Sequence, residues 1–404
     1  MSDVRPGFRT VFANSDYRRL FLAQTISRSG DTIAAIALLV LVFQLTGSGL
    51  GVAGVVIAEI LPVLLLSPVA GPLIDRLPRV HVMIAADLWR MALAAALPLV
   101  DQQVAGVYII AFGLSAGAVF FNPASASALP GIVKEGELLA ANSGLWSAAV
   151  IAQIVLAPLA GLAVTAWGAA PAFWINAATF AASAVILTGL RLPHDPQPLT
   201  GRWTSRVLEG GRLLVHDRLL RLLAIVQLLA ALSAGATSAL LVVLAAEQLN
   251  ASPTGFGILL GAIGIGAAVG PLLLTRLTNN PRRPALVFGP YLLRGVVDLV
   301  LATTRNLPTA AAALAVYGAG TSTGMVTYNS LLQAEVPTQL RGRVFASFDM
   351  IWQTGRLASL ALGGIAADQL GIQAVYVLGG LLLLVAGTIG LTGIPRNKPD
   401  DPGS

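Results

Sequence analysis

The chain of 404 residues contains no cysteine and only three histidines. The absence of cysteine excludes disulfides, thiolate metal sites and thiol catalysis. His81, His194 and His216 lie on or near predicted loops and do not have metal-ligand spacing. No Walker sequence occurs, so ATP hydrolysis by a P-loop is not expected either. The sequence therefore predicts no cofactor, no metal site and no enzymatic activity.

Charge is also scarce. Charged residues make up 11% of the chain and hydrophobic residues 56%, with a mean hydropathy of +0.79, whereas a soluble domain is about 25% charged. The net charge of +6 could indicate nucleic-acid binding, but no basic stripe follows one soluble face. We expect the basic residues to face anionic membrane lipids, and we expect no nucleic-acid partner.

The chain is instead rich in long hydrophobic stretches. A membrane-spanning helix needs about 20 mostly apolar residues, because the hydrocarbon core is about 30 Å thick and each residue rises about 1.5 Å. The sequence predicts an all-α integral membrane protein with twelve spans, at 19–45, 51–75, 80–100, 105–130, 140–167, 170–190, 219–247, 255–277, 284–303, 308–334, 343–368 and 373–394.

The basic residues alternate with these spans. All but five of the 25 lie in the N-terminal segment, in every second gap or in the C-terminal tail. The five exceptions are Arg305 in an outer gap and Arg28, Arg90, Arg294 and Arg356 within spans. Because basic residues are retained on the cytoplasmic side, the pattern predicts a multi-pass protein with both termini in the cytoplasm.

The two halves of the chain resemble each other. Residues 157–161 match 360–364, and Gly168 matches Gly371, at the same separation of 203 residues. Two parallel six-helix repeats are typical of carriers that open to each side of the membrane in turn. We predict two pseudo-symmetric six-helix bundles, with these bounds: 1–190 for the first bundle, 191–218 for a cytoplasmic linker, 219–394 for the second bundle and 395–404 for a cytoplasmic tail.

Residues 71–79, Gly-Pro-Leu-Ile-Asp-Arg-Leu-Pro-Arg, resemble the loop signature of the major facilitator superfamily. Further segments resemble its branch of macrolide efflux pumps and the enterobactin exporter; they are 26–31, 45–48, 122–124, 129–130 and 342–344. The resemblance implies a secondary active transporter in a bacterial cell membrane. It would work by alternating access and export a lipophilic or amphipathic small molecule, such as an antibiotic, drug or siderophore, in exchange for protons. We expect a monomer.

The signature contains a predicted gating latch, formed by Gly71, Asp75 and Arg76. In the superfamily the aspartate meets the N-terminal end of the eleventh helix, here the predicted span 343–368. Free N–H groups and the helix dipole favour an anion there. The glycine would let helices 2 and 11 approach closely. The alternative is a solvated charge pair that ends a helix. Ser125 stands where the branch usually has an arginine, which puts the full charge network of the latch in doubt.

Charged residues within the spans are the candidates for coupling and substrate binding, since a charge at mid-bilayer costs about 2.5–3.5 kcal/mol. Arg28 and Asp31 share a helix face and are either a structural pair or a substrate or proton site. Glu59 is either a proton carrier or the structural partner of Arg90. Arg356, seven residues after Asp349, is a candidate cavity residue.

Other pairs and other functions remain open. Arg294 and Asp298, four residues apart, are expected to neutralise each other. A metabolite importer on the same fold, proton-coupled or facilitative, is the first alternative function. A sensor or scaffold that moves no cargo is the second.

Overall fold

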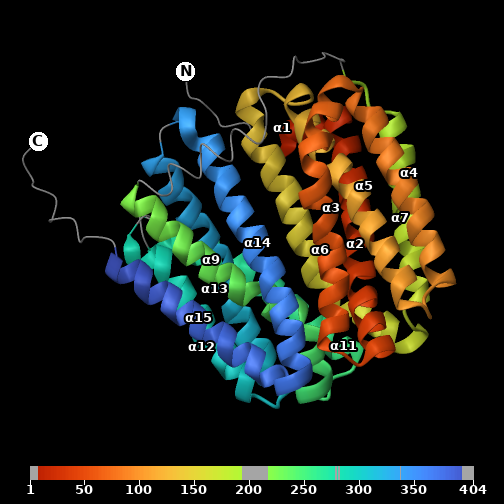
Figure 1. Cartoon of the computed structure of the whole chain (residues 1–404). Coiled ribbons are helices and arrows are strands. Elements are labelled where there is room, and N and C mark those ends of the chain that lie inside the picture. Colours follow the sequence, from red (N-terminus) through yellow and green to blue (C-terminus); the bar gives the residue numbers. More distant parts are fainter. Residues whose placement is uncertain (1–7, 193–216, 278–279, 281–282, 337, 394–404) are drawn as a thin grey trace, which may run out of the picture. The chain divides into compact units, whose positions relative to one another are not determined.

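The computed structural model describes residues 8–192, 217–277, 280, 283–336 and 338–393, and every regular element in these ranges is a helix (Figure 1). Twelve of the described helices are long: α2 Ser15–Thr46, α3 Gly49–Arg76, α4 Arg79–Ala96, α5 Val104–Ala128, α6 Leu138–Trp167, α7 Ala170–Thr188, α9 Arg218–Ala239, α11 Pro253–Leu277, α12 Pro284–Thr303, α13 Leu307–Glu335, α14 Thr338–Leu370 and α15 Ile372–Gly393. The short ones are α1 Phe8–Ala13, α10 Leu241–Val243 and four single turns, Leu97–Leu99, Leu129–Gly131, Glu135–Glu137 and Leu244–Gln248.

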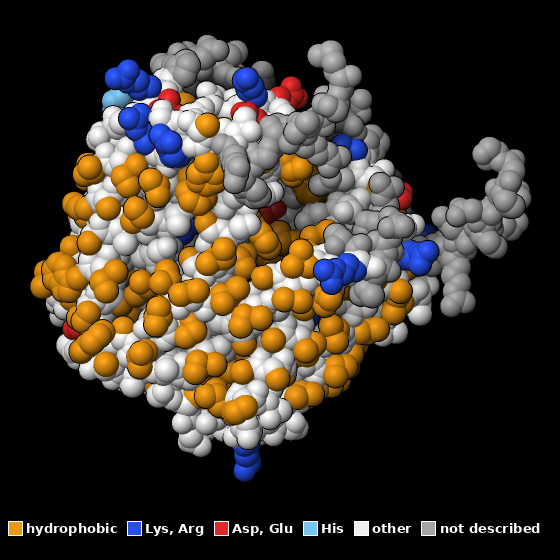
Figure 2. Space-filling model, turned by 180° about the vertical axis from the view of Figure 1, so that it is seen from behind, with side chains coloured by type: hydrophobic (Ala, Val, Ile, Leu, Met, Phe, Trp, Pro, Cys, Tyr) orange, Lys and Arg blue, Asp and Glu red, His pale blue; other side chains and the backbone are white. Residues whose placement is uncertain are grey.

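The long helices have the length and composition of membrane spans. Ten are both long and apolar enough to cross a bilayer, and the more polar α13 and α14, with 29 and 33 residues, complete the predicted twelve. Hydrophobic side chains are spread over much of the face seen in Figure 2. Large hydrophobic side chains that are mostly exposed include Leu99, Ile109 and Trp167. Such a surface is stable only in lipid, so the predicted class of fold is confirmed.

Local signals at the helix ends explain why the helices extend beyond the hydropathy-based spans. Asn14 caps α2, because its side-chain oxygen accepts from the backbone N–H groups of Asp16 and Tyr17. The helix therefore begins four residues before the predicted span at 19. It ends at Gly47, whose φ of 56° is left-handed. Ser48 then caps α3 by accepting from the backbone N–H of Gly51.

The internal repeat is visible in the helix packing of two compact units. The first comprises residues 1–201 and 240–264, the second residues 202–239 and 265–404. In the first unit α2 packs on α6 and α7, and α4 on α5 and α7. In the second unit α9 packs on α14 and α15, and α12 on α13 and α15. The matched glycines Gly168 and Gly371 end α6 and α14, with positive φ of 77° and 85°.

The seventh predicted span, 219–247, is not one continuous helix. The α-helix α9 ends at Ala239, and after Leu240 the chain continues as the single turn α10 and a π-helical turn, Leu244–Gln248. Residues 240–264, which include the first half of α11, pack with the first unit. There Gly257 approaches the backbone of Ala157, and Gly161 approaches that of Pro253. Hydropathy alone could not reveal this break, because the sequence stays apolar through it.

Most of the predicted linker 191–218 and the whole tail 395–404 lie outside the described residues. Each unit has its own hydrophobic core. In the first unit the core includes Tyr17, Leu20 and Met83, and in the second it includes Leu223, Phe288 and Leu332.

Candidate functional site

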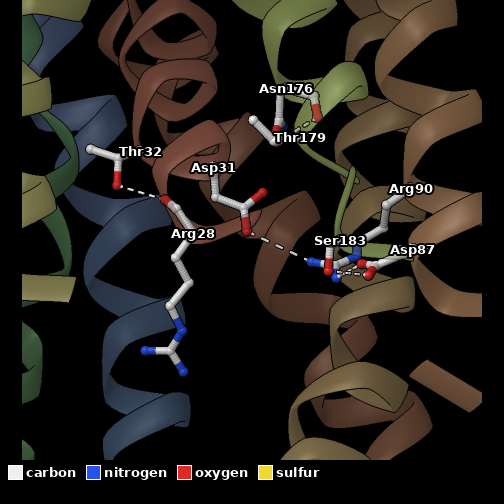
Figure 3. Close-up of polar contacts among 8 residues, drawn as sticks. All are labelled: Arg28, Asp31, Thr32, Asp87, Arg90, Asn176, Thr179 and Ser183. Atoms are coloured by element: carbon white, nitrogen blue, oxygen red, sulfur yellow. Dashed lines mark hydrogen bonds and ion pairs between the residues drawn. The ribbon is translucent and has the colours of Figure 1, made fainter. Parts of the chain in front are cut away.

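An arginine with two carboxylate partners lies inside the first unit. Arg90, on α4, is 4% exposed, and its Nη2 donates to Oδ1 of Asp87 at 2.5 Å, one turn earlier on the same helix. Its Nη1 lies 3.7 Å from Oδ2 of Asp31 on α2. Ser183 on α7 donates to the other Asp87 oxygen at 2.6 Å. Three helices thus meet in one polar cluster (Figure 3).

The guanidinium of Arg90 is also enclosed by apolar groups. It lies 4.6 Å from the ring centroid of Phe121 on α5 and 4.3 Å from that of Phe180 on α7, both favourable cation–π contacts. Gly117 on α5 makes room for its stem, because a Cβ there would lie 2.6 Å from the Arg90 Cγ. The arginine is therefore held in one orientation by packing as well as by charge.

A cavity of about 280 Å³ opens beside this cluster. Three of the predicted coupling residues, Asp31, Glu59 and Arg90, line it together. Asn176 adds a further polar group, and most of the other lining side chains are apolar, such as those of Leu38 and Phe173. The side chain of Asp31 is 46% exposed, whereas that of Asp87 is fully buried.

The geometry distinguishes two possible partners of Asp31 on α2. Asp31 forms its ion pair with Arg90 rather than with Arg28, three residues away on its own helix. Figure 3 shows the Asp31 carboxylate directed toward Arg90 and the Arg28 guanidinium extending away from it. Arg28 instead lines a separate pocket of about 300 Å³ together with Gln24, Asn122 and Ser125. In that pocket Gln24 donates to Ser125, the residue that replaces the arginine of the branch.

The predicted latch residues lie at the end of α3, but the side chain of Asp75 is outside the described residues. Arg76 is exposed. Among the described residues of its own unit, nothing lies within 4 Å of the position that a Cβ on Gly71 would take. The contact of this segment with α14, the eleventh predicted span, stays a prediction.

Arg356 is half-buried on α14, in the second unit. Its backbone carbonyl lies 2.6 Å from the position of a Cβ on Gly235, so α9 and α14 approach closely at this level. Asp349, which lies seven residues before Arg356 on the same helix, lines a cavity in the second unit.

The second unit contains its own buried arginine, which interacts electrostatically with Asp298 as expected but makes its direct polar contact with a different residue. Arg294 on α12 is 8% exposed, and its Nη2 donates to the hydroxyl of Tyr317 on α13 at 2.8 Å. Among the ion pairs of the described residues, none joins Arg294 to Asp298, although they are four apart on one helix. Asp298 instead accepts from Ser233 on α9 at 3.5 Å.

Two residues that contact the buried arginine or its acid could not be recognised from the sequence. Ser183 and Tyr317 lie in apolar helices, and they matter only because they form hydrogen bonds to residues of neighbouring helices. Asp87 had a weak signal, namely its position one turn before a buried arginine.

Solved structures with this fold are membrane transporters. A bacterial homologue of the iron transporter ferroportin in the inward-facing state has a TM-score of 0.77 at 15% identity, over 94% of this chain and 98% of that chain. The nucleoside transporter NupG has a TM-score of 0.74 at 15% identity, over the same shares. At such identities the likeness shows the fold alone.

The family follows from sequence similarity over almost the whole chain. The family described as transmembrane secretion effector matches residues 9–401, and the chain belongs to it. Multidrug efflux pump Tap of Mycolicibacterium fortuitum is 29% identical over 398 residues, which cover 95% of this chain and 96% of the relative. Macrolide efflux protein A of Streptococcus pyogenes is 24% identical, over 90% of this chain and 92% of the relative. The protein is thus a multi-pass membrane transporter of small molecules with efflux pumps among its relatives.

Proposed function

We propose that the protein exports a lipophilic or amphipathic small molecule in exchange for protons, by alternating access across a bacterial plasma membrane. It would act as a monomer with both termini in the cytoplasm. The relatives named as multidrug and macrolide efflux pumps support the direction and the broad class of cargo. The placement of basic residues supports the orientation.

The observation that carries the proton coupling is the unequal contact of Arg90 with its two acids. Asp87 lies at 2.5 Å, is fully buried and accepts a second bond from Ser183. Asp31 lies at 3.7 Å and is half-exposed to the cavity. The first contact is a direct charge-assisted hydrogen bond, whereas the second exceeds hydrogen-bond length.

This inequality lets Asp31 change its charge at low cost. When Asp31 takes up a proton, Arg90 keeps Asp87 as its counter-ion, so no buried charge is left uncompensated. Glu59, on the wall of the same cavity, is a second carboxylate that a proton can reach. Asp31 and Glu59 are therefore the proposed proton carriers, and Arg90 and Asp87 form the fixed part of the site.

The protonation of Asp31 would then set the affinity for cargo. With Asp31 protonated the cavity holds one fewer negative charge, and its walls remain mostly apolar. Alternating access would use the latch of Gly71, Asp75 and Arg76 to close the cytoplasmic side, with the acid at the N-terminal end of α14. Arg28 and Arg356 would line the path of the cargo.

Resistance profiling in a pump-deleted bacterial host tests this function. The wild type is compared with Asp31→Asn, Glu59→Gln and Asp75→Asn across a compound panel, with and without an uncoupler. We expect the wild type to confer uncoupler-sensitive resistance to some lipophilic compounds, and the two cavity variants to lose most of it. The matched control is Glu135→Gln, which removes an exposed carboxylate of the same unit.

Two results would contradict the proposal. A wild type that changes no susceptibility across a broad panel would argue against drug export. Retention of uncoupler-sensitive export by both Asp31→Asn and Glu59→Gln would remove the coupling assignment. Accumulation of the compounds inside cells that express the wild type would instead indicate an importer.

A further inference from the structure

We infer that the second unit carries a cargo-binding subsite, centred on Arg294, that recognises lipophilic molecules bearing a carboxylate, a phenolate or a similar oxygen acceptor. This inference rests on the proposed export function and adds to it the chemistry of the cargo. It concerns a cavity of about 390 Å³ whose lining residues all belong to the second unit.

Arg294 supplies the donors. A guanidinium has five N–H groups, and among the described residues the only hydrogen bond of the Arg294 side chain runs from Nη2 to Tyr317. The Tyr317 ring also lies 4.7 Å below the guanidinium carbon, which holds the group in place. Its Nε also has no partner in the described part of the chain, but it is buried, so the donors available to a ligand are those of the terminal nitrogens. A buried arginine with unused donors on a cavity wall favours an acceptor that can take two of them at once.

The other walls suit an aromatic or lipophilic body. Tyr291, Tyr328, Phe348 and Trp352 line the cavity, and Met325 adds a flexible apolar surface. Pockets that bind drug-sized molecules usually measure about 300–1,000 Å³ and combine apolar walls with a few polar groups. The cavity of the second unit reaches this range and has both features.

Asp349 limits the charge of the occupant. Its carboxylate side chain lines the same cavity, and it repels an anion while Arg294 attracts one. A molecule with one or two acceptor groups on a large apolar body is therefore favoured over a small, highly charged anion, which would not fill the apolar walls.

Dye binding to the purified full-length protein in detergent, followed by fluorescence anisotropy, tests the subsite without any ion gradient. Fluorescein is the probe, because it is a planar aromatic molecule with carboxylate and phenolate oxygens. Ethidium, a planar aromatic cation without such acceptors, is the comparison dye. We expect the wild type to bind fluorescein, and Arg294→Gln to weaken that binding about tenfold or more while affecting ethidium little.

A second variant guards against loss of folding as the explanation. Asp349→Asn removes the repelling carboxylate, so it should strengthen fluorescein binding severalfold, and a misfolded protein cannot produce a gain. The control Arg305→Gln makes the same chemical change as Arg294→Gln at an exposed position of the same unit, and it should bind like the wild type.

The subsite would be overturned by a wild type that does not bind fluorescein, by Arg294→Gln binding it as tightly as the wild type, or by Asp349→Asn weakening it. These outcomes are distinct from a failure of the export proposal. If fluorescein binds through Arg294 but no uncoupler-sensitive export occurs, the site stands and the proton-driven function falls.

Discussion

Each unit holds a buried arginine on its third long helix, Arg90 on α4 and Arg294 on α12. Both arginines pack against a glycine of the following helix, Gly117 or Gly320, which are 203 residues apart. The partners differ. Arg90 contacts two carboxylates, whereas Arg294 contacts the hydroxyl and the ring of Tyr317.

Both repeats thus keep a buried arginine at the corresponding helix. The groups that contact this arginine differ between the repeats. Asp31 has Ala234 at the matching position of the second unit, 203 residues later. The first unit therefore places two carboxylates against its arginine. In the second unit the direct polar contact of the arginine is a tyrosine hydroxyl. Equal folds with unequal chemistry fit the proposed division between proton coupling and cargo recognition.

The largest expected difference concerns the loss of each arginine. Arg90→Gln leaves Asp87 fully buried without its counter-ion, which should cost about 3–5 kcal/mol of the free energy of unfolding. Arg294→Gln should cost less, because the direct contact of Arg294 is a hydrogen bond to Tyr317 and its interaction with Asp298 is electrostatic without a contact within 4 Å. Thermal unfolding in detergent measures both. The double variant Arg90→Gln/Asp87→Asn should recover much of the loss, and equal losses for the two arginines would contradict the comparison.

The two acids of the first unit should separate stability from transport. Asp87→Asn weakens a buried, charge-assisted bond and should lower the free energy of unfolding by about 1.5–3 kcal/mol. Asp31→Asn should lower it by less than about 1 kcal/mol, because that pair is long and half-exposed. Unfolding and uncoupler-sensitive efflux are measured on the same variants. A stable Asp31→Asn protein with intact coupled efflux would remove the proposed role.

The glycines beside the arginines offer a smaller test. A Cβ on Gly117 would lie 2.6 Å from the Arg90 Cγ, whereas one on Gly320 would lie 3.3 Å from the Arg294 Cγ. Gly117→Ala should therefore cost about 1–3 kcal/mol by overpacking, and Gly320→Ala clearly less. Thermal unfolding of the pair checks the order, and a reversed order would show that Arg90 can move aside.

The smallest effect is expected at the partner of Arg294. Tyr317→Phe keeps the ring under the guanidinium and removes the hydrogen bond from Nη2, so it should lower stability by about 0.5–1.5 kcal/mol. Unfolding measurements on this variant and on Tyr108→Phe, which removes a hydroxyl bond to the Gly51 carbonyl in the first unit, provide the comparison. A loss well above that of the control would mean that Arg294 depends on Tyr317 more than the geometry implies.

Hydropathy and charge placement were sufficient to predict the helices, because the bilayer imposes length and composition on each span. They also drew attention to Asp31, Glu59 and Arg90, since charges within apolar spans are rare. The contacts could not be predicted. Whether Asp31 faces Arg28 or Arg90 depends on how α2 is rotated against α4. Ser183, which donates to Asp87, lies on α7 and is 96 residues away from Asp87 in the sequence. The break after Ala239 was equally hidden.

Proton movement driven by cargo is the most direct test of the central claim. Purified protein is reconstituted into liposomes that enclose a pH-sensitive dye and have a proton gradient across their membrane. An exported compound from the resistance panel is then added, and the dye reports the change in internal pH. The wild type and Glu135→Gln should both release protons when cargo is present, and Asp31→Asn should not. Cargo movement by the wild type without any accompanying proton movement would contradict the account.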